Sequence, residues 1–276
     1  MKLTGWRRIA GAMWRAPDDP QIFGTLEVDA TALLAHLAHA REAGLHLTPT
    51  HLLGRALAYA LHAVPDLNVR IVGSRLYSRP SVDIFFITAV GQGDLSGVKV
   101  VDADQKSAPE IARELGEKAS ALRRGKDPGF ARTKRLMERL PHFMLRPLVR
   151  LFAWLAGTHA LKLPALGLEA SPFGSAMVSS VGMLGLPTGF SPLAWMYKVP
   201  ILVLGGQIAD KPVAIEGHVE VRKVMPVTAT IDHRYADGWH IAALLAPFRE
   251  YLADPARFEP ALPAPLHVDG EQLPTH

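Results

Sequence analysis

The sequence predicts an α+β domain in which helices flank a mixed β-sheet. Several segments have apolar residues every three or four positions, which is the spacing of one helix face. Short β-branched runs bounded by glycine, proline or asparagine, typical of strands, lie between them. Their order does not follow the strict strand–helix–strand repeat of a doubly wound sheet. The 276 residues suffice for one large domain or two small ones.

The first predicted elements are a strand and a helix within residues 25–44. The strand covers TLEVD, and the helix carries an apolar stripe of Leu33, Leu37 and Ala40, with His36 outside that stripe. A glycine follows the last residue of the stripe, which is a typical helix stop.

A second predicted helix starts with Thr48 as its cap and Pro49 in its first turn. It is apolar on most sides, so we expect it deep in the core. Strands with a turn near Gly73 follow. The next helix carries Ser107 and Glu110 at the spacing of a capping box.

Residues 126–172 interrupt this pattern. They are rich in arginine and large apolar residues, and Pro141 and Pro147 are expected to divide them into short helices. Basic residues interleaved with apolar ones suit a helix pair packed against a neighbouring subunit. They equally suit an interfacial segment at a membrane or over an acyl-chain site. Both interpretations stay open.

The last third of the chain returns to strands and ends in a helix. The turn at Glu216–Gly217 marks a hairpin, and the final helix is expected over about 238–253. The proline-rich end, 257–276, predicts a mobile tail. We therefore expect one domain over 1–256, with an insertion at about 126–172.

Composition excludes several kinds of site. The sequence has no cysteine, which excludes disulfides, thiol nucleophiles and cysteine-based zinc sites and is compatible with a reducing cytoplasm. No run of about 18 uncharged apolar residues predicts a transmembrane helix. The net charge of +4 suits an anionic ligand such as a nucleotide, or an anionic membrane. No pattern indicates a metal site or nucleic-acid binding.

One segment, ATIDHRYADG, carries the candidate catalytic histidine. His233 ends a β-branched run, where an imidazole can project into a cleft and accept a proton near neutral pH. Asp237 can fix the loop by pairing with an arginine, and Gly238 permits a sharp entry into the last helix. We interpret Asp232 as a loop-stabilising carboxylate. From these residue types alone, an incidental histidine at a strand end is the more common outcome.

DHRYADG resembles the His-x-x-x-Asp-Gly signature of coenzyme A-dependent acyltransferases, which include the catalytic domains of 2-oxo acid dehydrogenase complexes and chloramphenicol acetyltransferase. Other segments resemble the family in the same order: WRRIAGAM its first helix, LTPTHLLGRALAYALHAVPDLN its second, VSSVGMLG its Ile-Ser-Asn-Leu-Gly stretch, and VPILVLGGQIADKPVAIEGHVEV its last hairpin. The resemblance covers about 5–125 and 172–256. It implies the α+β, chloramphenicol acetyltransferase-like fold, a two-layer sandwich.

The resemblance also implies roles for individual residues. His233 would be the general base that takes a proton from a thiol or hydroxyl, while that nucleophile attacks an acyl thioester. Ser179 would donate a hydrogen bond to the oxyanion; its alternative is an ordinary polar residue on a sheet face. Asp237 would be structural, with Arg7 or Arg8 as its partner. The family domain is a trimer or a multiple of it, so His233 and Ser179 would come from different chains.

The sequence departs from the family in three places. We expect no lipoyl domain before the catalytic domain and no covalently bound lipoyl group, so that a lipoyl group is either supplied in trans or replaced by another acceptor. The 126–172 insertion replaces a shorter connection. Gly185 and Pro192 of the family's glycine-rich stretch are kept, but its second glycine is replaced, with Gly189 nearby. This changes the expected shape of the acyl pocket.

The sequence therefore predicts an acyltransferase that uses coenzyme A, as acyl-coenzyme A, and a thiol, hydroxyl or amine acceptor that is small or protein-carried. We expect a homotrimer or a multiple of it, without metal or nucleic acid and located in the cytoplasm. Membrane-surface contact through the insertion is one of the two interpretations left open above. The alternative is a non-catalytic trimeric scaffold or regulatory relative.

Overall fold

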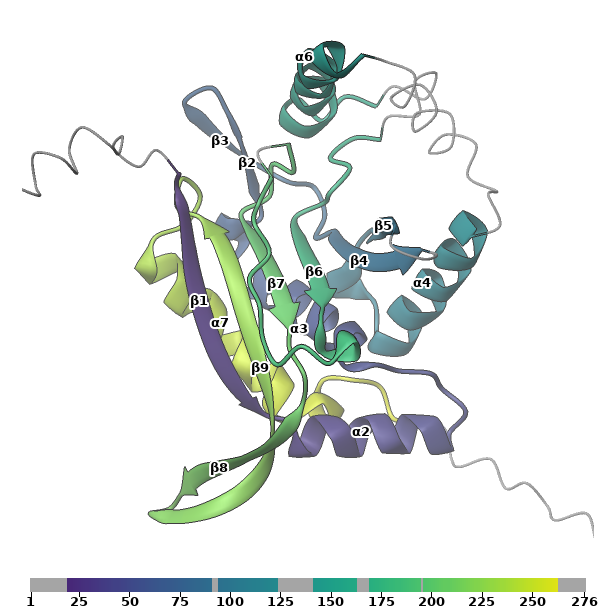
Figure 1. The fold of residues 1–276 in the computed structure, drawn as a ribbon, viewed down its shortest axis with the longest axis vertical. Helices are drawn as coiled ribbons and strands as arrows, with labels where there is room; N and C mark the ends of the chain where they lie inside the picture. The colour runs from purple at the N-terminus through teal and green to yellow at the C-terminus, as the bar shows by residue number, and fades with distance from the viewer. Residues whose placement is uncertain (1–18, 91–93, 124–140, 163–168, 195, 263–276) are drawn as a thin grey trace, which may run out of the picture.

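A computed structural model describes residues 19–90, 94–123, 141–162, 169–194 and 196–262 (Figure 1). The predicted first helix around Arg7 and Arg8 lies outside these described residues.

A mixed sheet forms the centre of the described chain. It has seven strands, in the order β1-β9-β7-β6-β4-β5, with β8 paired to β9. The β4–β6 and β6–β7 pairs are parallel and the others antiparallel, which confirms the mixed sheet. The strands are β1 Gln21–Asp29, β4 Ile84–Val90, β5 Asp94–Val100, β6 Ala176–Ser180, β7 Ile201–Gly205, β8 Ala209–Ile215 and β9 His218–Asp232. A separate hairpin pairs β2, Val69–Val72, with β3, Arg75–Ser78.

Helices cover one face of the sheet, as the two-layer prediction requires. Figure 1 shows α3 and α7 behind the strands, with α2 along the lower edge and α4 beside β5. The helices that cover the sheet are α2 Thr31–Glu42, α3 Pro49–Ala63, α4 Ala108–Arg123 and α7 Gly238–Ala253. The main core lies between this layer and alternate residues of the strands, such as Ile84, Val178 and Val227. A smaller cluster around Met177 and Leu202 lies on the opposite face.

Helix α3 is the centre of the core, as its composition predicted. Leu52, Leu53 and Leu57 are almost completely buried. Gly54 lets the helix approach the sheet, because a Cβ at this position would lie 2.1 Å from Cζ of Phe86. The contact excludes any larger residue at position 54 unless the ring moves.

The predicted helix starts and turns are present. The Thr48 and His51 side chains form a reciprocal capping box at α3. Glu110 accepts from the backbone N–H of Ser107 at 2.8 Å, as the second box requires. Glu216 and Gly217 both have positive φ, 49° and 83°, which suits the tight turn between β8 and β9.

Two sequence expectations about helices are wrong. Pro147 does not divide its segment but lies inside α6, His142–Phe152, which continues into a π-helical turn, η3, Ala153–Thr158. The carbonyl of Phe143, which loses its helical donor, lies on a residue that is 78% exposed, so water can hydrogen-bond to it. His36 is buried and not outside the stripe, because it lies three residues after Leu33 and four before Ala40, on the same side of α2.

The packed chain extends beyond the expected boundary at 256. Glu259 is buried and accepts from the Tyr251 hydroxyl and from the backbone N–H of Ala108, both at 2.6 Å. Phe258 packs against the same core. Residues 263–276 of the predicted tail lie outside the described residues.

Candidate active site

The candidate base lies on a short loop between β9 and α7. His233 is exposed, while its backbone N–H donates to the carbonyl of Pro20 at 2.8 Å. The preceding Asp232 donates its backbone N–H to the carbonyl of Pro200 at 2.9 Å. The Tyr235 N–H closes a turn onto the Asp232 carbonyl at 2.9 Å. The backbone around the histidine is therefore fixed by two other segments, and its imidazole faces solvent.

The carboxylate of Asp232 binds the side chain of Arg234, two residues further along the loop. Its Oδ1 accepts from Nε of Arg234 at 2.9 Å and from the Arg234 backbone N–H at 3.0 Å, and its Oδ2 accepts from Nη2 at 2.5 Å. This hydrogen bonding raises the pKa of Arg234. The carboxylate is largely buried, so the paired arginine supplies the charge that it needs.

Tyr235 ties the loop to the β2–β3 hairpin. Its ring is buried, which raises its pKa, and it lines one depression together with Val69 and Leu76 of the hairpin. Beside it, Arg79 donates from Nε to the Val69 carbonyl at 3.1 Å and from Nη2 to the Lys198 carbonyl at 2.7 Å. Hairpin, loop and the start of β7 thus form one connected unit.

Asp237 caps helix α7. Its Oδ1 accepts from the backbone N–H groups of Trp239 and His240, at 3.0 and 3.1 Å, and is 2.6 Å from Nδ1 of His240. The pKa of Asp237 is lowered, first of all by the His240 side chain. Its expected partners Arg7 and Arg8 lie outside the described residues.

The predicted role of Gly238 is not supported. Its φ is not in the left-handed region, and a Cβ there would meet open space within this chain. The entry into α7 is instead made by the cap at Asp237, whose backbone is extended.

An open depression of about 710 Å³ lies in front of this loop. Its lining comes from the loop, the start of α7 and the β2–β3 hairpin: Asp66, Val69, Leu76, Ser78, His233, Arg234, Tyr235, Ala236, Asp237 and His240. His233 and the Asp237–His240 pair therefore face one space. Two imidazoles, one of them oriented by a carboxylate, can exchange protons with a bound molecule.

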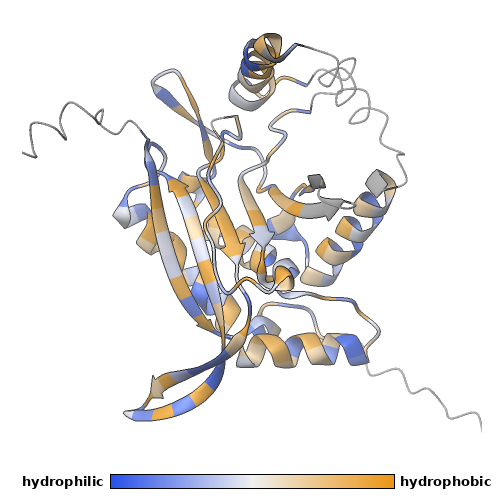
Figure 2. Ribbon diagram, viewed as in Figure 1, coloured by the Kyte–Doolittle hydropathy of each residue, from blue (hydrophilic) through white to orange (hydrophobic). Residues whose placement is uncertain are grey.

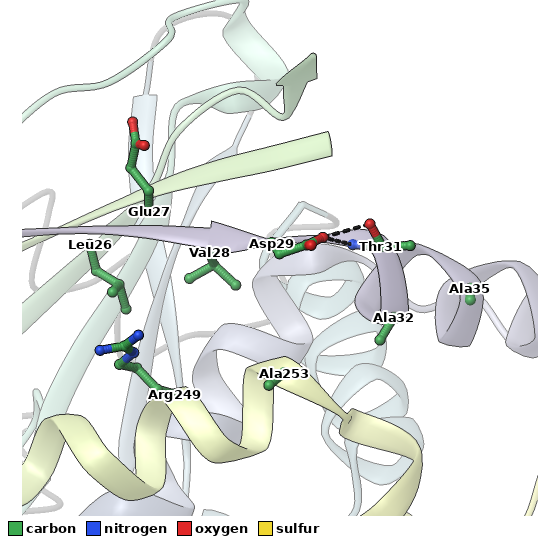
Figure 3. Close-up of a pocket in the computed structure, with 9 residues that line it drawn as sticks. All are labelled: Leu26, Glu27, Val28, Asp29, Thr31, Ala32, Ala35, Arg249 and Ala253. Atoms are coloured by element: carbon green, nitrogen blue, oxygen red, sulfur yellow. Dashed lines mark hydrogen bonds between the residues drawn. The ribbon is translucent and has the colours of Figure 1, made fainter. Parts of the chain in front are cut away.

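A second depression, of about 480 Å³, lies between β1, α2 and α7 and contains none of the predicted residues. Figure 3 shows Glu27 on the far side of β1, away from Arg249. Asp29 there accepts from Thr31, through the backbone N–H at 2.9 Å and the hydroxyl at 2.5 Å. The Asp29 carboxylate thus stabilises the start of α2 through Thr31, so we assign no chemistry to this depression.

Ser179 lies at the other end of the sheet. It is half-buried on β6, on the same face as Met177, and is in register with Leu204 of β7 and, through it, Thr228 of β9. His233 is five residues further along β9 and two strands across. Strand geometry puts the two side chains on the order of 15 Å or more apart. Within one chain they cannot act on the same bond.

The described residues contain no cluster of three or more His, Asp or Glu side chains that could hold a metal ion. The Gly189 stretch covers the sheet face near Ser179, and its carbonyl accepts from the Thr228 hydroxyl at 2.5 Å.

Sequence reasoning missed Arg79, Tyr235 and His240. The spacing of Asp237 and His240 marks an i,i+3 pair at a helix start and could have indicated their contact. Tyr235 stands inside the recognised motif. Arg79 has no local signal, because its partner at Lys198 is far away in the sequence.

A family model matches most of the chain. It is described as 2-oxoacid dehydrogenases acyltransferase (catalytic domain) and matches residues 1–127 and 166–259. The dihydrolipoyllysine-residue acetyltransferase component of the acetoin cleaving system of Bacillus subtilis is 27% identical over 263 residues, which are 92% of this chain and 55% of that protein. The corresponding pyruvate dehydrogenase component of Zymomonas mobilis is 23% identical over 92% of this chain and 50% of its own length. The chain thus spans about half the length of these curated relatives.

Solved structures share the fold. A probable dihydrolipoamide acetyltransferase of Listeria monocytogenes superposes with a TM-score of 0.64 at 21% identity, over 96% of this chain and 97% of that one. The dihydrolipoamide acetyltransferase of Azotobacter vinelandii gives 0.62 at 24% identity, over 87% and 84%. That structure's name concerns a serine, a histidine and an asparagine in its catalytic mechanism. A third relative is the cubic core of a pyruvate dehydrogenase multienzyme complex, with 0.61 at 23% identity, over 87% and 84%.

Proposed function

The chain belongs to the acyltransferase (catalytic domain) family of the 2-oxoacid dehydrogenases, and from this premise we propose that it transfers an acyl group between a coenzyme A thioester and an acceptor. His233 is the proposed general base. The observation that carries the proposal is its placement: an exposed imidazole on a loop whose backbone is bonded to Pro20 and Pro200, in front of an open depression.

The proposed reaction uses side chains of the protein alone. His233 accepts the proton of an acceptor thiol, hydroxyl or amine, which then attacks the thioester carbonyl carbon. Ser179 donates a hydrogen bond from its hydroxyl to the resulting oxyanion. When the intermediate collapses, the carbon–sulfur bond breaks and the leaving thiolate takes the proton back from His233. Asp237 and Asp232 hold the loop in place, through α7 and Arg234.

We propose that each centre is shared between two chains of a homotrimer or a multiple of it. The separation of Ser179 and His233 along the sheet supports this, since one chain alone cannot bring them together. A relative of the same fold that forms a cubic core also supports it.

The acceptor and the setting are proposals too. The names of the relatives suggest a dihydrolipoyllysine residue carried by another polypeptide as one acceptor. Coenzyme A is the proposed cosubstrate, and the proposed reaction needs no metal ion. A cytoplasmic location is likewise a prediction.

Subunit mixing tests the proposal. His233→Ala and Ser179→Ala are each expected to lower the formation of acetyl-dihydrolipoamide from acetyl-coenzyme A and dihydrolipoamide by about 10²- to 10³-fold. After denaturation and refolding together, the two inactive variants should regain part of the activity, because some centres then contain one intact His233 and one intact Ser179. His218→Ala, at an exposed histidine in β9, is the matched control and should change nothing.

Three outcomes would contradict parts of the proposal. Full activity in His233→Ala would reject the base. Absence of recovery in the refolded mixture, with each variant refolding normally alone, would reject the shared centre. Wild-type protein that transfers acetyl and longer acyl groups to no thiol, hydroxyl or amine acceptor would favour the scaffold alternative.

A further inference from the structure

We propose that the insertion binds the surface of an anionic lipid membrane through α6 and η3. The α6–η3 surface is defined by six exposed side chains: Phe143, Met144, Arg146, Arg150, Leu151 and Trp154. This surface lies between the two parts of the chain that the family model matches, so the proposal goes beyond the acyl transfer reaction.

The apolar members of this surface point outward. Phe143 is 78% exposed, Trp154 53%, Leu151 49% and Met144 45%. Met144 and Leu151, seven residues apart, lie on one side of the helix. Figure 2 shows the apolar colouring of α6 at the outer end of the molecule. Large exposed apolar clusters of this kind mark contact sites.

The segment is nevertheless anchored to the body. Ala153, Ala156 and Gly157 of η3 are buried. The carbonyl of Thr158 accepts from Nη1 of Arg70 in the β2–β3 hairpin at 3.2 Å. The outward direction of α6 is therefore set by packing at η3.

The charge of this surface favours an anionic partner. Arg146 and Arg150 are exposed one turn apart, beside the apolar side chains. No aspartate or glutamate occurs in residues 139–168. In a symmetric contact between two copies of this surface, the arginines would find no carboxylate to pair with. Phosphate headgroups above an acyl layer match both components, because the arginines can reach the phosphates while the apolar side chains enter the acyl boundary.

The geometry suits binding along the membrane. Helix α6 has 11 residues, about 16 Å, roughly half of a hydrocarbon core. Within the described ranges, no helix is long and apolar enough to cross a membrane. The ring of Trp154 packs edge-on against His159, with the ring centroids 4.5 Å apart. Tryptophan is a residue type that concentrates at the lipid–water boundary.

The same end of the molecule carries the His233 depression. The hairpin that bonds to Thr158 also contributes Leu76 and Ser78 to the lining of that depression. Membrane binding would thus place the depression near the lipid surface. If the proposed acyl transfer holds, substrates with lipid-soluble acyl chains would have the shortest path to His233.

Vesicle flotation of the full chain tests the membrane contact without any activity measurement. The protein should float with vesicles of equal parts phosphatidylglycerol and phosphatidylcholine, and not with phosphatidylcholine alone. Arg146→Gln with Arg150→Gln should weaken binding about 30-fold. Leu151→Ser with Trp154→Ser should weaken it at least about tenfold. The matched control is Val219→Ser with Val221→Ser, 77% and 71% exposed on the β8–β9 hairpin, which should bind like wild type.

Several results would overturn the proposal. One is that the wild-type protein does not float with vesicles that contain phosphatidylglycerol, and another is that the arginine variant floats as well as wild type. A third is that the control variant loses as much binding as the variant with Leu151→Ser and Trp154→Ser. If wild type does not float and Leu151→Ser with Trp154→Ser lowers the mass measured by light scattering, the surface is an interface between copies. Circular dichroism of each variant distinguishes lost binding from lost folding.

Discussion

Helices α3 and α6 are both rich in leucine and other apolar residues, yet they bury them differently. In α3, Leu57 is 1% exposed and lies between the sheet and α7; in α6, Leu151 is 49% exposed. The family model matches the first helix and not the second. Apolar composition therefore predicts a helix without predicting what covers it. Removing apolar side chains should destabilise the fold at α3 and leave it unchanged at α6.

The largest expected effect is at the core. Leu57→Ala should lower the free energy of unfolding by about 2–5 kcal/mol, because it removes buried methyl groups and leaves a cavity. Urea denaturation measures this loss. Leu57→Met, which nearly conserves volume, should cost less than about 1.5 kcal/mol. Equal losses in the two variants would show that shape and not volume dominates at this position.

The second effect is a pH dependence at the start of α3. His51 accepts from the Thr48 N–H at 3.2 Å, and burial lowers its pKa from 6.5 to about 4. The neutral form is therefore favoured in the folded protein. The contribution of neutral His51 to the free energy of unfolding is therefore fully present above pH 6.5. It is lost as the pH falls toward 4, which lowers the free energy of unfolding by up to about 3 kcal/mol.

The matched variant is His51→Gln, whose amide can still accept from Thr48 but does not titrate. Urea denaturation at about pH 7 and pH 4.5 should show a larger loss for wild type than for the variant. If wild type and His51→Gln lose the same free energy of unfolding between these pH values, other groups cause the pH dependence.

A smaller effect is expected in the loop that carries His233. Asp232→Asn should cost about 1 kcal/mol, because a largely buried carboxylate loses the charge that pairs with Arg234. Glu220→Gln removes the charge from a pair with Arg222 at the same sequence spacing, whose carboxylate is more exposed, and should change almost nothing. Denaturation of both variants at low and high salt checks this. Equal costs would mean that burial contributes nothing at Asp232.

The smallest effect is expected at α6. Leu151→Ala should change the free energy of unfolding by less than about 0.5 kcal/mol, because half of the side chain already contacts water. A loss comparable to that of Leu57→Ala would show that another part of the chain covers this helix. That result would remove the contrast between the two helices.

Local patterns predicted much of the fold. The capping boxes at Thr48 and Ser107, the turn at Gly217 and the helix over 238–253 depend on neighbouring residues and are present. The wrong predictions concerned positions whose structure depends on contacts or exposure beyond the neighbouring residues. Pro147 stays inside a helix, although it cannot donate to the carbonyl of Phe143, a residue that is 78% exposed.

The candidate site was predicted in part. Motif order predicted His233 and Ser179, but no local pattern joins Arg79 to Lys198 or places Tyr235 beside Leu76, because these contacts cross large sequence distances. Gly238 was expected to make a turn that an Asp237 cap makes instead. Under the proposed shared centre, the contact of Ser179 with His233 depends on a second chain, which no pattern within one chain describes.

The placement of Ser179 and His233 at opposite ends of one sheet has a genetic consequence. Under a shared centre, a chain that has lost both residues spoils the centres on both of its sides. In a cell with one normal and one doubly altered gene copy, functional centres would be scarcer than normal chains. Such an allele should be dominant-negative, whereas alleles that lose only one of the two residues should complement each other.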